Sequence, residues 1–463
     1  MRRGAIGNFL ICLVGVGLAC VVTPARADLY AASAAYKKGD FPAAFKQFQE
    51  LAELGQPTAQ YDLAVMYAKG QGVAASQTFA HAWASLASTG GETQGAELRA
   101  ELEPNLTPTS LQISAELQAK FNQSALDARL MPRFLKNREF ETREAPRRLK
   151  NPAPEYPEEA RRHGVQGEVY VEFIVAPDGR ARLPRILHAV PSGYFENAVR
   201  ENIMRSEFLP GRINGEPVAT PVSTFYNFKM NYTAGDYVGL ERRVEETLKK
   251  ANDGDPSAQM LYGMMIAGLP QLKQSYDQAL PWFLKAAQAG APYAQYQVGT
   301  GLLMGRGCRC EAGKGEIWLE KAAQNDQPDA QVSLAEYLMR EKSNPEAVTS
   351  ALIWLDRAVK QGSNSAKLRL AAILAASPSE AIRNPARALA LSEGLDRDYG
   401  RDPSLWEIRA AADASRGDFK SAVKAQAEAI SGATRLNWDL ASLNARQSAY
   451  RSNQAWTGDL LAY

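Results

Sequence analysis

Residues 292–327 read PYAQYQVGTGLLMGRGCRCEAGKGEIWLEKAAQNDQ, and this pattern recurs along the chain. Four such stretches start at residues 256, 292, 328 and 364, so they are 36 residues apart. In each stretch, apolar residues at offsets i, i+4, i+5 and i+8 mark one face of a helix. The tryptophans of a second helix align as well: Trp282, Trp318 and Trp354. Each unit is therefore predicted to be a helical hairpin that buries its apolar face against its neighbours, which makes an α-solenoid.

One more unit stands apart from the others, near the N-terminus. PTAQ at 57–60 matches PSAQ at 256–259, and the same offset carries Trp83 to the position of Trp282. That offset is 199 residues and is not a multiple of 36. About 163 residues of another kind must therefore separate this unit from the rest.

The units resemble the Sel-like repeats, which are relatives of the tetratricopeptide repeats. The resemblance covers about 37–95 and 250–365 and rests on Tyr67-Ala-Lys-Gly70-Gln-Gly72-Val73, on Gly305-Arg-Gly307 and on an A-xx-W-xxx-AA pattern. Less regular helical hairpins are expected at 28–55 and 403–430. We expect the concave face of the solenoid to hold a protein partner.

The segment between the repeats lacks the 36-residue helical pattern. A helix is predicted from Thr107, as N-cap, to about Ala128. After a charged stretch, residues 156–179 read YPEEARRHGVQGEVYVEFIVAPDG, which predicts a short helix, an alternating strand and a turn. A second strand, a helix capped by Ser192 and a final strand at 222–230 follow. The order helix, strand, strand, helix, strand predicts a three-stranded antiparallel sheet with helices on one side.

Residues 151–232 resemble the C-terminal domain of the TonB family of energy transducers. The resemblance is carried by Tyr156-Pro157, Gly167-Glu-Val169, Pro177-Asp-Gly179, Ile186-Leu187, Phe195, Phe208-x-Pro210, Gly215 and Phe228. In that family the domain lies in the periplasm and binds a short segment of outer-membrane receptors as an extra strand beside its last strand. An open edge strand offers N–H and C=O groups to an extended peptide. The resemblance thus implies a peptide-binding edge formed by Tyr156, Pro157, Ser223, Phe225, Asn227 and Lys229.

The chain departs from the TonB pattern in several respects. Ser206 replaces the aromatic residue that usually precedes Phe208-x-Pro210, and the long Pro-rich spacer is missing. The N-terminal segment has no histidine, and more than 200 residues follow the domain. These departures favour a protein-binding scaffold. A TonB-type energy transducer for receptor-mediated transport, anchored by an uncleaved N-terminal segment, is the alternative.

The first 27 residues have the layout of a secretory signal peptide. Arg2-Arg3 precede an apolar stretch at 4–22, and Ala25-Arg26-Ala27 offers a cleavage site before Asp28. Cleavage there would leave the protein in the periplasm of a Gram-negative bacterium, whereas an uncleaved segment would anchor it in the inner membrane. The expected partners are envelope proteins or peptides, such as segments of outer-membrane receptors.

Composition argues against several other functions. After cleavage the chain has 50 basic and 51 acidic residues, so its net charge gives no reason to expect nucleic-acid binding. Its two remaining cysteines, Cys308 and Cys310, are too few for a zinc site, and Cys308 aligns with small apolar loop residues. The three histidines, His81, His163 and His188, form no catalytic or metal-ligand pattern. We therefore predict no enzyme activity, no cofactor, no metal and no small-molecule substrate.

The fold class predicted from the sequence is mainly α, an α-solenoid of 36-residue helical hairpins with a small α+β domain that has a three-stranded antiparallel sheet. The expected parts are a signal peptide at 1–27, an N-terminal helical repeat block at 28–130, a charged linker at 131–150, a TonB-like domain at 151–233, a solenoid at 236–431 and a C-terminal cap or tail at 432–463.

Overall fold

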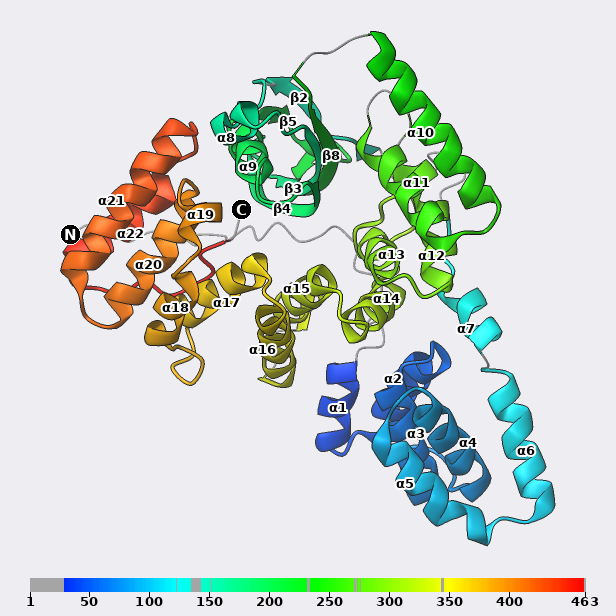
Figure 1. Cartoon of the computed structure of the whole chain (residues 1–463). Helices are drawn as coiled ribbons and strands as arrows, with labels where there is room; N and C mark the ends of the chain where they lie inside the picture. Colours follow the sequence, from blue (N-terminus) through cyan, green and yellow to red (C-terminus); the bar gives the residue numbers. More distant parts are fainter. Residues whose placement is uncertain are drawn as a thin grey trace, which may run out of the picture.

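The computed structural model describes residues 29–461, except for 122, 135–142, 151, 231–233, 270–271, 273, 275 and 343–344. The predicted signal peptide and the alternative membrane anchor, both within 1–27, lie outside the described residues. Figure 1 shows two helical blocks and a small domain that contains most of the strands. The predicted fold class is confirmed: helical hairpins dominate, and the small domain holds a three-stranded antiparallel sheet.

The N-terminal block consists of two helical hairpins followed by three further helices, two of which pack on the second hairpin. Its α-helices are α1 (Leu29–Lys37), α2 (Phe41–Glu53), α3 (Pro57–Lys69), α4 (Gln77–Thr89), α5 (Thr93–Leu102), α6 (Pro108–Ala119) and α7 (Gln123–Leu130). Thr107 caps α6 as predicted, because its hydroxyl accepts a hydrogen bond from the Ser110 N–H. The single helix predicted from Thr107 to about Ala128 is wrong, since α6 ends at Ala119 and α7 starts at Gln123.

The C-terminal solenoid follows the small domain. Its α-helices are α10 (Ala234–Asn252), α11 (Pro256–Gly268), α12 (Tyr276–Gln288), α13 (Pro292–Met304), α14 (Ala312–Gln324), α15 (Pro328–Tyr337), α16 (Pro345–Lys360), α17 (Asn364–Ala376), α18 (Pro385–Ser392), α19 (Asp396–Tyr399), α20 (Pro403–Ser415), α21 (Phe419–Arg435) and α22 (Ala441–Arg451). The predicted hairpin at 403–430 is thus present as α20 and α21.

A buried glutamine links each regular unit to the helix before it. In the first helix of a unit, the glutamine of the P-x-A-Q start donates a hydrogen bond to a carbonyl eight residues earlier. The four bonds are Gln60 to Ala52, Gln259 to Ala251, Gln295 to Ala287, and Gln331 to Ala323. The amide therefore satisfies a carbonyl at the end of the preceding helix, where helices leave such groups without a partner. This explains why glutamine recurs inside an otherwise apolar contact.

Tight packing within the hairpins also follows the repeat. A Cβ atom at Gly263 would lie 2.9 Å from the Phe283 ring, and one at Gly299 would lie 2.9 Å from Leu319. Trp318 is fully buried, and Cys308 is buried in the same core, as expected for a small apolar residue in a loop. Residues that are equivalent in the aligned repeats therefore occupy the same packing positions in successive hairpins.

The small domain, residues 152–230, is called the β module below. It contains α8 (Glu158–Arg162), β3 (Gly167–Val175), β4 (Ala181–Val190), α9 (Glu196–Arg205), β5 (Glu207–Leu209), β6 (Gly211–Ile213), β7 (Glu216–Val218) and β8 (Thr220–Phe228). The main sheet has the antiparallel order β4-β3-β8. Its register shifts between Arg185 and Arg182, on either side of Pro184, whose missing N–H cannot join the ladder. The Ser192 cap is wrong: α9 begins after Phe195, and Ser192 instead donates a side-chain hydrogen bond to Glu196.

One face of the sheet carries the core of the module. Val169, Val171 and Phe173 of β3 pack here against Phe195 and Val199, at the start of α9, and all five side chains are buried. We call this the apolar face. Ser206, which stands where the TonB family usually has an aromatic residue, is buried too and donates a hydrogen bond to the Asn202 carbonyl at 2.8 Å.

Part of the predicted linker belongs to the fold of the module. The strands β1 (Arg143–Glu144) and β2 (Arg147–Lys150) pair with β6 and β5. The Arg148 guanidinium lies over the Phe208 ring and donates a hydrogen bond to the Tyr226 hydroxyl. The expectation that 143–150 is a solvated linker is therefore wrong, because the aliphatic and planar parts of Arg148 can cover aromatic rings.

The solenoid curves around the β module. Figure 1 shows the helices from α10 to α22 as an arc, with the sheet inside the arc and the N-terminal block outside it. The block joins the solenoid through α7: the Leu130 side chain is fully buried in the solenoid core, and the Trp318 indole donates a hydrogen bond to its carbonyl. At the other end, Leu460 and Leu461 are buried in the solenoid core, so the C-terminal segment is a packed cap.

Candidate peptide-docking edge

The predicted docking strand lies at an end of the sheet. β8 pairs with β3 on one side, and no other strand of the described ranges pairs with it. β4 forms the opposite end of the sheet. The geometry that strand addition requires, a terminal β-strand at the position predicted from the sequence, is therefore present.

The predicted residues of the edge have different environments. In the register with β3, Ser223 is opposite Glu172, and Phe225 is opposite Tyr170. The ring centroids of Phe225 and Tyr170 are 4.5 Å apart. Asn227 is exposed near the end of the strand, and Lys229 follows that end. The structure thus brings Ser223 and Phe225 together on one face of β8, where they contact their cross-strand neighbours.

Tyr156 and Pro157 serve the fold of the module. The Tyr156 ring packs edge-on against Phe195 and Phe228, and its hydroxyl donates a hydrogen bond of 2.6 Å to the Val165 carbonyl. Pro157 is the N-cap residue of α8. Tyr156 therefore holds the segment before α8 against the end of β8, which places 152–157 close to the predicted edge.

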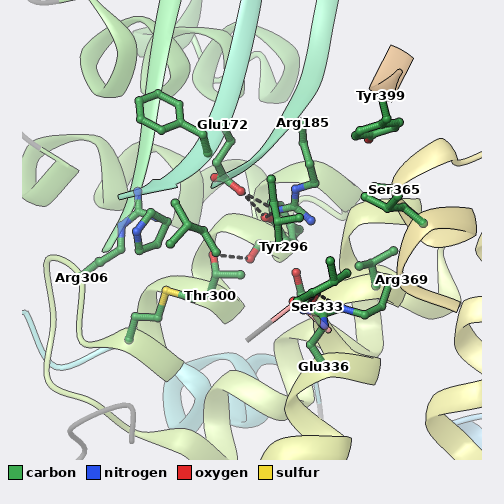
Figure 2. Close-up of a pocket in the computed structure, with 18 residues that line it drawn as sticks. Glu172, Arg185, Tyr296, Thr300, Arg306, Ser333, Glu336, Ser365, Arg369 and Tyr399 are labelled. Atoms are coloured by element: carbon green, nitrogen blue, oxygen red, sulfur yellow. Dashed lines mark hydrogen bonds and ion pairs between the residues drawn. The ribbon is translucent and has the colours of Figure 1, made fainter. Parts of the chain in front are cut away.

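The face of the sheet opposite the apolar face meets the solenoid. It carries Tyr170, Glu172, Arg185 and Phe225, and we call it the docking face. α11 contacts β8, and a Cβ atom at Gly268 of α11 would lie 2.7 Å from the Phe225 ring. Only a residue without a side chain fits this contact. Beside it, a cavity separates the docking face from α13, α15 and α17 (Figure 2).

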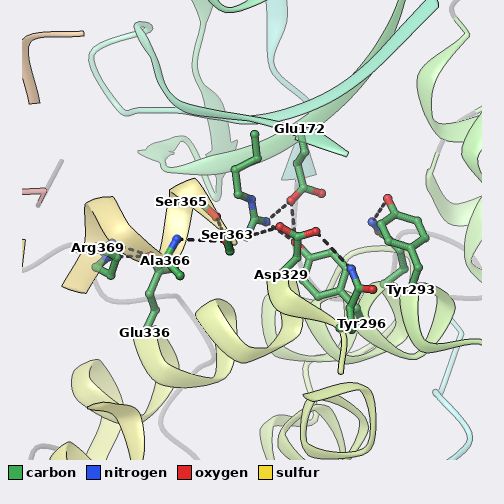
Figure 3. A network of polar contacts seen from close by, with 12 residues as sticks. Glu172, Tyr293, Tyr296, Asp329, Glu336, Ser363, Ser365, Ala366 and Arg369 are labelled. Atoms are coloured by element: carbon green, nitrogen blue, oxygen red, sulfur yellow. Dashed lines mark hydrogen bonds and ion pairs between the residues drawn. The ribbon is translucent and has the colours of Figure 1, made fainter. Parts of the chain in front are cut away.

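A network of polar groups crosses from the docking face to the solenoid (Figure 3). Glu172 forms an ion pair of 2.5 Å with Arg185 and accepts a hydrogen bond of 2.7 Å from the Tyr296 hydroxyl. Arg185 also contacts that hydroxyl and lies 3.6 Å from Asp329. Glu172 is 4% exposed, so its charge depends on these partners rather than on water.

Burial and neighbouring charges shift the pKa values of the network. Burial raises the pKa of Glu172, but Arg185 and Arg306 outweigh this effect and hold the pKa below its ordinary value. Burial raises the pKa of Asp329, although Arg185 opposes the shift. Burial also raises the pKa of Tyr296 well above its ordinary value, so its hydroxyl stays protonated and can donate to Glu172.

Further ion pairs surround the network. Arg243 of α10 binds Glu168 of β3 at 3.0 Å, Arg200 of α9 lies 3.2 Å from Asp398 of α19, and Arg401 lies 2.6 Å from Glu201. Arg182 of β4 lies over the Trp438 ring, 3.7 Å from its centroid. The β module is thus held by contacts near both ends of the solenoid arc.

Sequence reasoning missed the docking face. The alternation of β3 places Glu168, Tyr170, Glu172 and Ile174 on one side, and such a mixed row is typical of a solvent-exposed face. The tyrosine and isoleucine were the available signal that this side is covered. Its partners, Tyr296 and Asp329, come from repeats more than 100 residues later, and the sequence does not indicate that they meet β3.

The three histidines lie apart from one another. His81 is buried in α4, and its Nδ1 lies 2.8 Å from the Ser114 hydroxyl. Burial lowers its pKa, which keeps the ring neutral. His163 and His188 are exposed; His163 is the C-cap residue that follows α8, and His188 lies on β4. Within the described ranges, no group of three or more His, Cys, Asp or Glu side chains could hold a metal ion.

The fold and its interrupted repeat define a class of protein, a helical-repeat solenoid with an inserted β module. Comparison with known families then identifies both parts. Residues 152–230 match the family described as Gram-negative bacterial TonB protein C-terminal, and residues 57–92, 256–290, 292–327 and 328–363 match the Sel1 repeat. The chain therefore carries a TonB-like C-terminal domain among Sel1 repeats, as the sequence predicted, and both matched families support a role in protein interaction.

The curated relatives are similar to a short part of the chain. The chain is 39% identical to protein TonB of Escherichia coli K12 over 67 residues, which are 14% of this chain and 28% of that protein. It is 33% identical to protein TonB of Pseudomonas aeruginosa over 82 residues, which are 18% of this chain and 24% of that protein. The chain thus spans about a quarter of the length of these relatives.

Two solved structures have some similarity to this chain. A Sel1 repeat protein from Oxalobacter formigenes is 28% identical, with 26% of this chain and 90% of that chain covered and a TM-score of 0.24. A protective antigen of uropathogenic Escherichia coli with an SLR fold is 16% identical, with 88% and 70% covered and a TM-score of 0.34. Among the described helices, none is long and apolar enough to cross a membrane.

Proposed function

We propose that the protein is a non-catalytic periplasmic scaffold that binds an extended peptide by strand addition along the outer side of β8. The observation that carries this proposal is the place of β8, which is an end strand of a sheet that matches the TonB C-terminal family. An added strand would gain main-chain hydrogen bonds along the 9 residues of β8. Envelope proteins, among them outer-membrane receptor segments, are the proposed partners.

A second partner would bind the N-terminal block. The concave side of the C-terminal solenoid already holds the β module, so the concave site expected from the sequence is occupied within the chain. The N-terminal block lies outside the arc (Figure 1), and it exposes large apolar side chains at Phe79 and Ile113. We therefore place the second interaction on α4 and α6.

A photo-crosslinking residue at Asn227 tests the strand addition. Asn227 is exposed on β8, and His188 is exposed at the opposite end of the sheet on β4, so His188 is the matched control position. In cells, Asn227 should capture envelope polypeptides, and His188 should not. Equal capture at both positions would contradict the proposal, because it would show no preference for the β8 side.

A proline on β8 gives a second test. Phe225→Pro removes one backbone N–H and also the ring that packs on Tyr170. Phe225→Leu removes the aromatic ring but keeps the N–H, so it serves as the control. We expect capture from Asn227 to fall at least tenfold in the proline variant and to stay within about twofold in the leucine variant. Circular dichroism checks that both variants fold.

The alternative is an energy transducer that stays in the inner membrane through the apolar stretch at 4–22. Sequencing the N-terminus of the mature protein separates the two functions. A start at Asp28 would remove the anchor, and with it the transducer. A start at Met1 would favour the transducer over the periplasmic scaffold.

A further inference from the structure

A partly open cavity lies between the docking face and the concave side of the solenoid. It has a volume of about 80 Å³ and is lined by β3 and β4 on one side and by α13, α15 and α17 on the other (Figure 2). Leu461 of the packed C-terminal segment also lines it. Ligand sites are common at such junctions between domains, where walls from separate parts of the chain converge.

Most of the wall is apolar. Ile174, Leu183, Met304, Val332 and Leu368 all contribute to it. Water fills a cavity well only where it finds several polar partners. This aliphatic part of the wall offers water no hydrogen-bond partner and therefore suits the hydrocarbon part of a ligand.

Two arginines of the wall have carboxylate partners. Arg185 is paired with Glu172 and Asp329, as described above. Arg369 lies 2.7 Å from Glu336 and 3.3 Å from Asp459. These arginines and the two lining glutamates therefore compensate one another, and none of them requires a ligand.

The third arginine differs. Arg306 follows α13, lines the cavity and is half-buried. Within the described ranges its side chain forms no ion pair or hydrogen bond; instead its guanidinium lies 3.7 Å from the centroid of the Tyr276 ring. Contact with a ring face leaves the N–H groups at the rim of the guanidinium available. The hydroxyl of Ser333 lines the same cavity and likewise has no hydrogen-bond partner among the described residues.

We propose that this cavity binds a small aliphatic carboxylate, with the carboxylate at Arg306 and the hydrocarbon chain against the apolar wall. Arg306 acts on Glu172 from beyond ion-pair distance and forms no direct ion pair within the described ranges, so its N–H groups can bind an anionic group, and the planar guanidinium matches a carboxylate. Size limits the ligand further. Since one water molecule needs about 10–15 Å³ of such volume, the cavity holds about five to eight heavy atoms.

Isothermal titration calorimetry of the mature chain with pentanoate tests the site. Pentanoate fits the size, pentanamide has the same shape without the charge, and inorganic phosphate has a charge without a hydrocarbon chain. We expect one pentanoate per chain with a Kd of about 1 mM or tighter. Pentanamide and phosphate should each bind at least tenfold more weakly.

Variants then assign the binding to the cavity. Arg306→Gln should weaken pentanoate at least tenfold, and Arg306→Lys should restore part of the affinity because it keeps the charge. Ser333→Leu should abolish binding by filling the space. Lys420→Gln, which removes an exposed charge from α21, is the matched control and should leave the affinity unchanged. Thermal melting confirms that each variant is folded.

The outcomes are distinct. Loss of binding in both Arg306→Gln and Ser333→Leu, with an unchanged Lys420→Gln, supports the proposal. Absence of saturation by about 20 mM pentanoate in the unaltered chain would overturn it. Equal affinity of the unaltered chain and folded Arg306→Gln would overturn it as well, since the carboxylate would then not lie at Arg306.

Discussion

The two faces of the central sheet are built from alternate residues of the same strands but differ in chemistry. The apolar face buries the valines and the one phenylalanine of β3 against α9. The docking face carries Tyr170, Glu172 and Arg185, and it meets hydroxyl and carboxylate groups of the solenoid. The difference shows that contacts on the apolar face fold the module, whereas contacts on the docking face fix its position against the solenoid.

Physical reasons support this division. Burial of apolar surface is favourable in any orientation, so the apolar face can stabilise the module by itself. A buried ion pair adds little net free energy, because desolvation of the charges offsets their attraction, but loss of one partner is costly. The docking face therefore selects one arrangement of module and solenoid more than it stabilises the fold.

The largest expected effect comes from the apolar face. Phe195 is fully buried and stacks on Phe228, with ring centroids 4.3 Å apart. We expect Phe195→Ala to destabilise the β module by about 3–5 kcal/mol. Hydrogen exchange of β3 should become fast. All seven tryptophans lie outside 152–230, so their fluorescence in urea should still report an intact solenoid. If slow exchange in β3 and the fluorescence of the folded solenoid were lost together, the solenoid would depend on the folded module.

The next effect concerns the docking face. Glu172→Gln keeps the shape of the side chain but leaves Arg185 with Asp329 as its only carboxylate partner in the network. We expect this variant to weaken docking by about 2 kcal/mol while the module stays folded. Hydrogen exchange should rise in β4, next to the solenoid, and not in α8, which packs on the module core through Ala160. Faster exchange in both elements would mean that the two faces do not act separately.

A smaller effect is expected from acid. Because Arg185 and Arg306 hold the pKa of Glu172 below its ordinary value of 4.5, this carboxylate stabilises the docked state at and above that pH. Its contribution is lost as the pH falls through the lowered pKa. Asp329 acts in the opposite direction, because its raised pKa removes a penalty as the pH falls. The exchange rate of β4 amides, divided by their intrinsic rate at each pH, should therefore stay nearly constant at first between pH 6 and pH 3 and rise only at the acid end. The Glu172→Gln chain should lack most of this rise.

The smallest effect on docking is expected for the exposed ion pair between Arg401 and Glu201. The Arg401 side chain is 73% exposed where it meets Glu201, so water and salt screen the pair. Arg401→Gln should change docking by less than about 0.5 kcal/mol. The buried Arg200, whose side chain is 10% exposed beside Asp398, is the comparison, and Arg200→Gln should cost more. Equal effects of the two variants would show that exposure does not govern these pairs.

Much of the fold could be predicted from the sequence because it depends on local repetition. Residues equivalent to Ala258 and to Trp282 recur every 36 residues in successive repeats. Each set of equivalent residues occupies one packing position of the hairpins. The module was recognisable from its alternating strand and from its resemblance to TonB. The strands at 143–150 were missed because Arg147 and Arg148 do not alternate with apolar residues, although β2 pairs with β5.

The candidate site was less accessible to prediction. The position of β8 at the end of the sheet follows from the order of the elements, and it was predicted. That Phe225 lies against Tyr170 and α11 was not, because this contact depends on how the solenoid curves around the module. The cavity at Arg306 could not be predicted from the sequence pattern either, since its walls come from elements far apart in the chain.

The ion pair between Glu172 and Arg185 also matters for biosynthesis. Both residues belong to the β module, which leaves the ribosome before the repeats that supply Tyr296 and Asp329. An apolar docking face would have to wait for those repeats while exposed, and exposed apolar surface invites aggregation. A face whose charges already neutralise each other tolerates water during this interval. The ion pair that orients the module in the folded protein can thus also limit aggregation of the nascent chain.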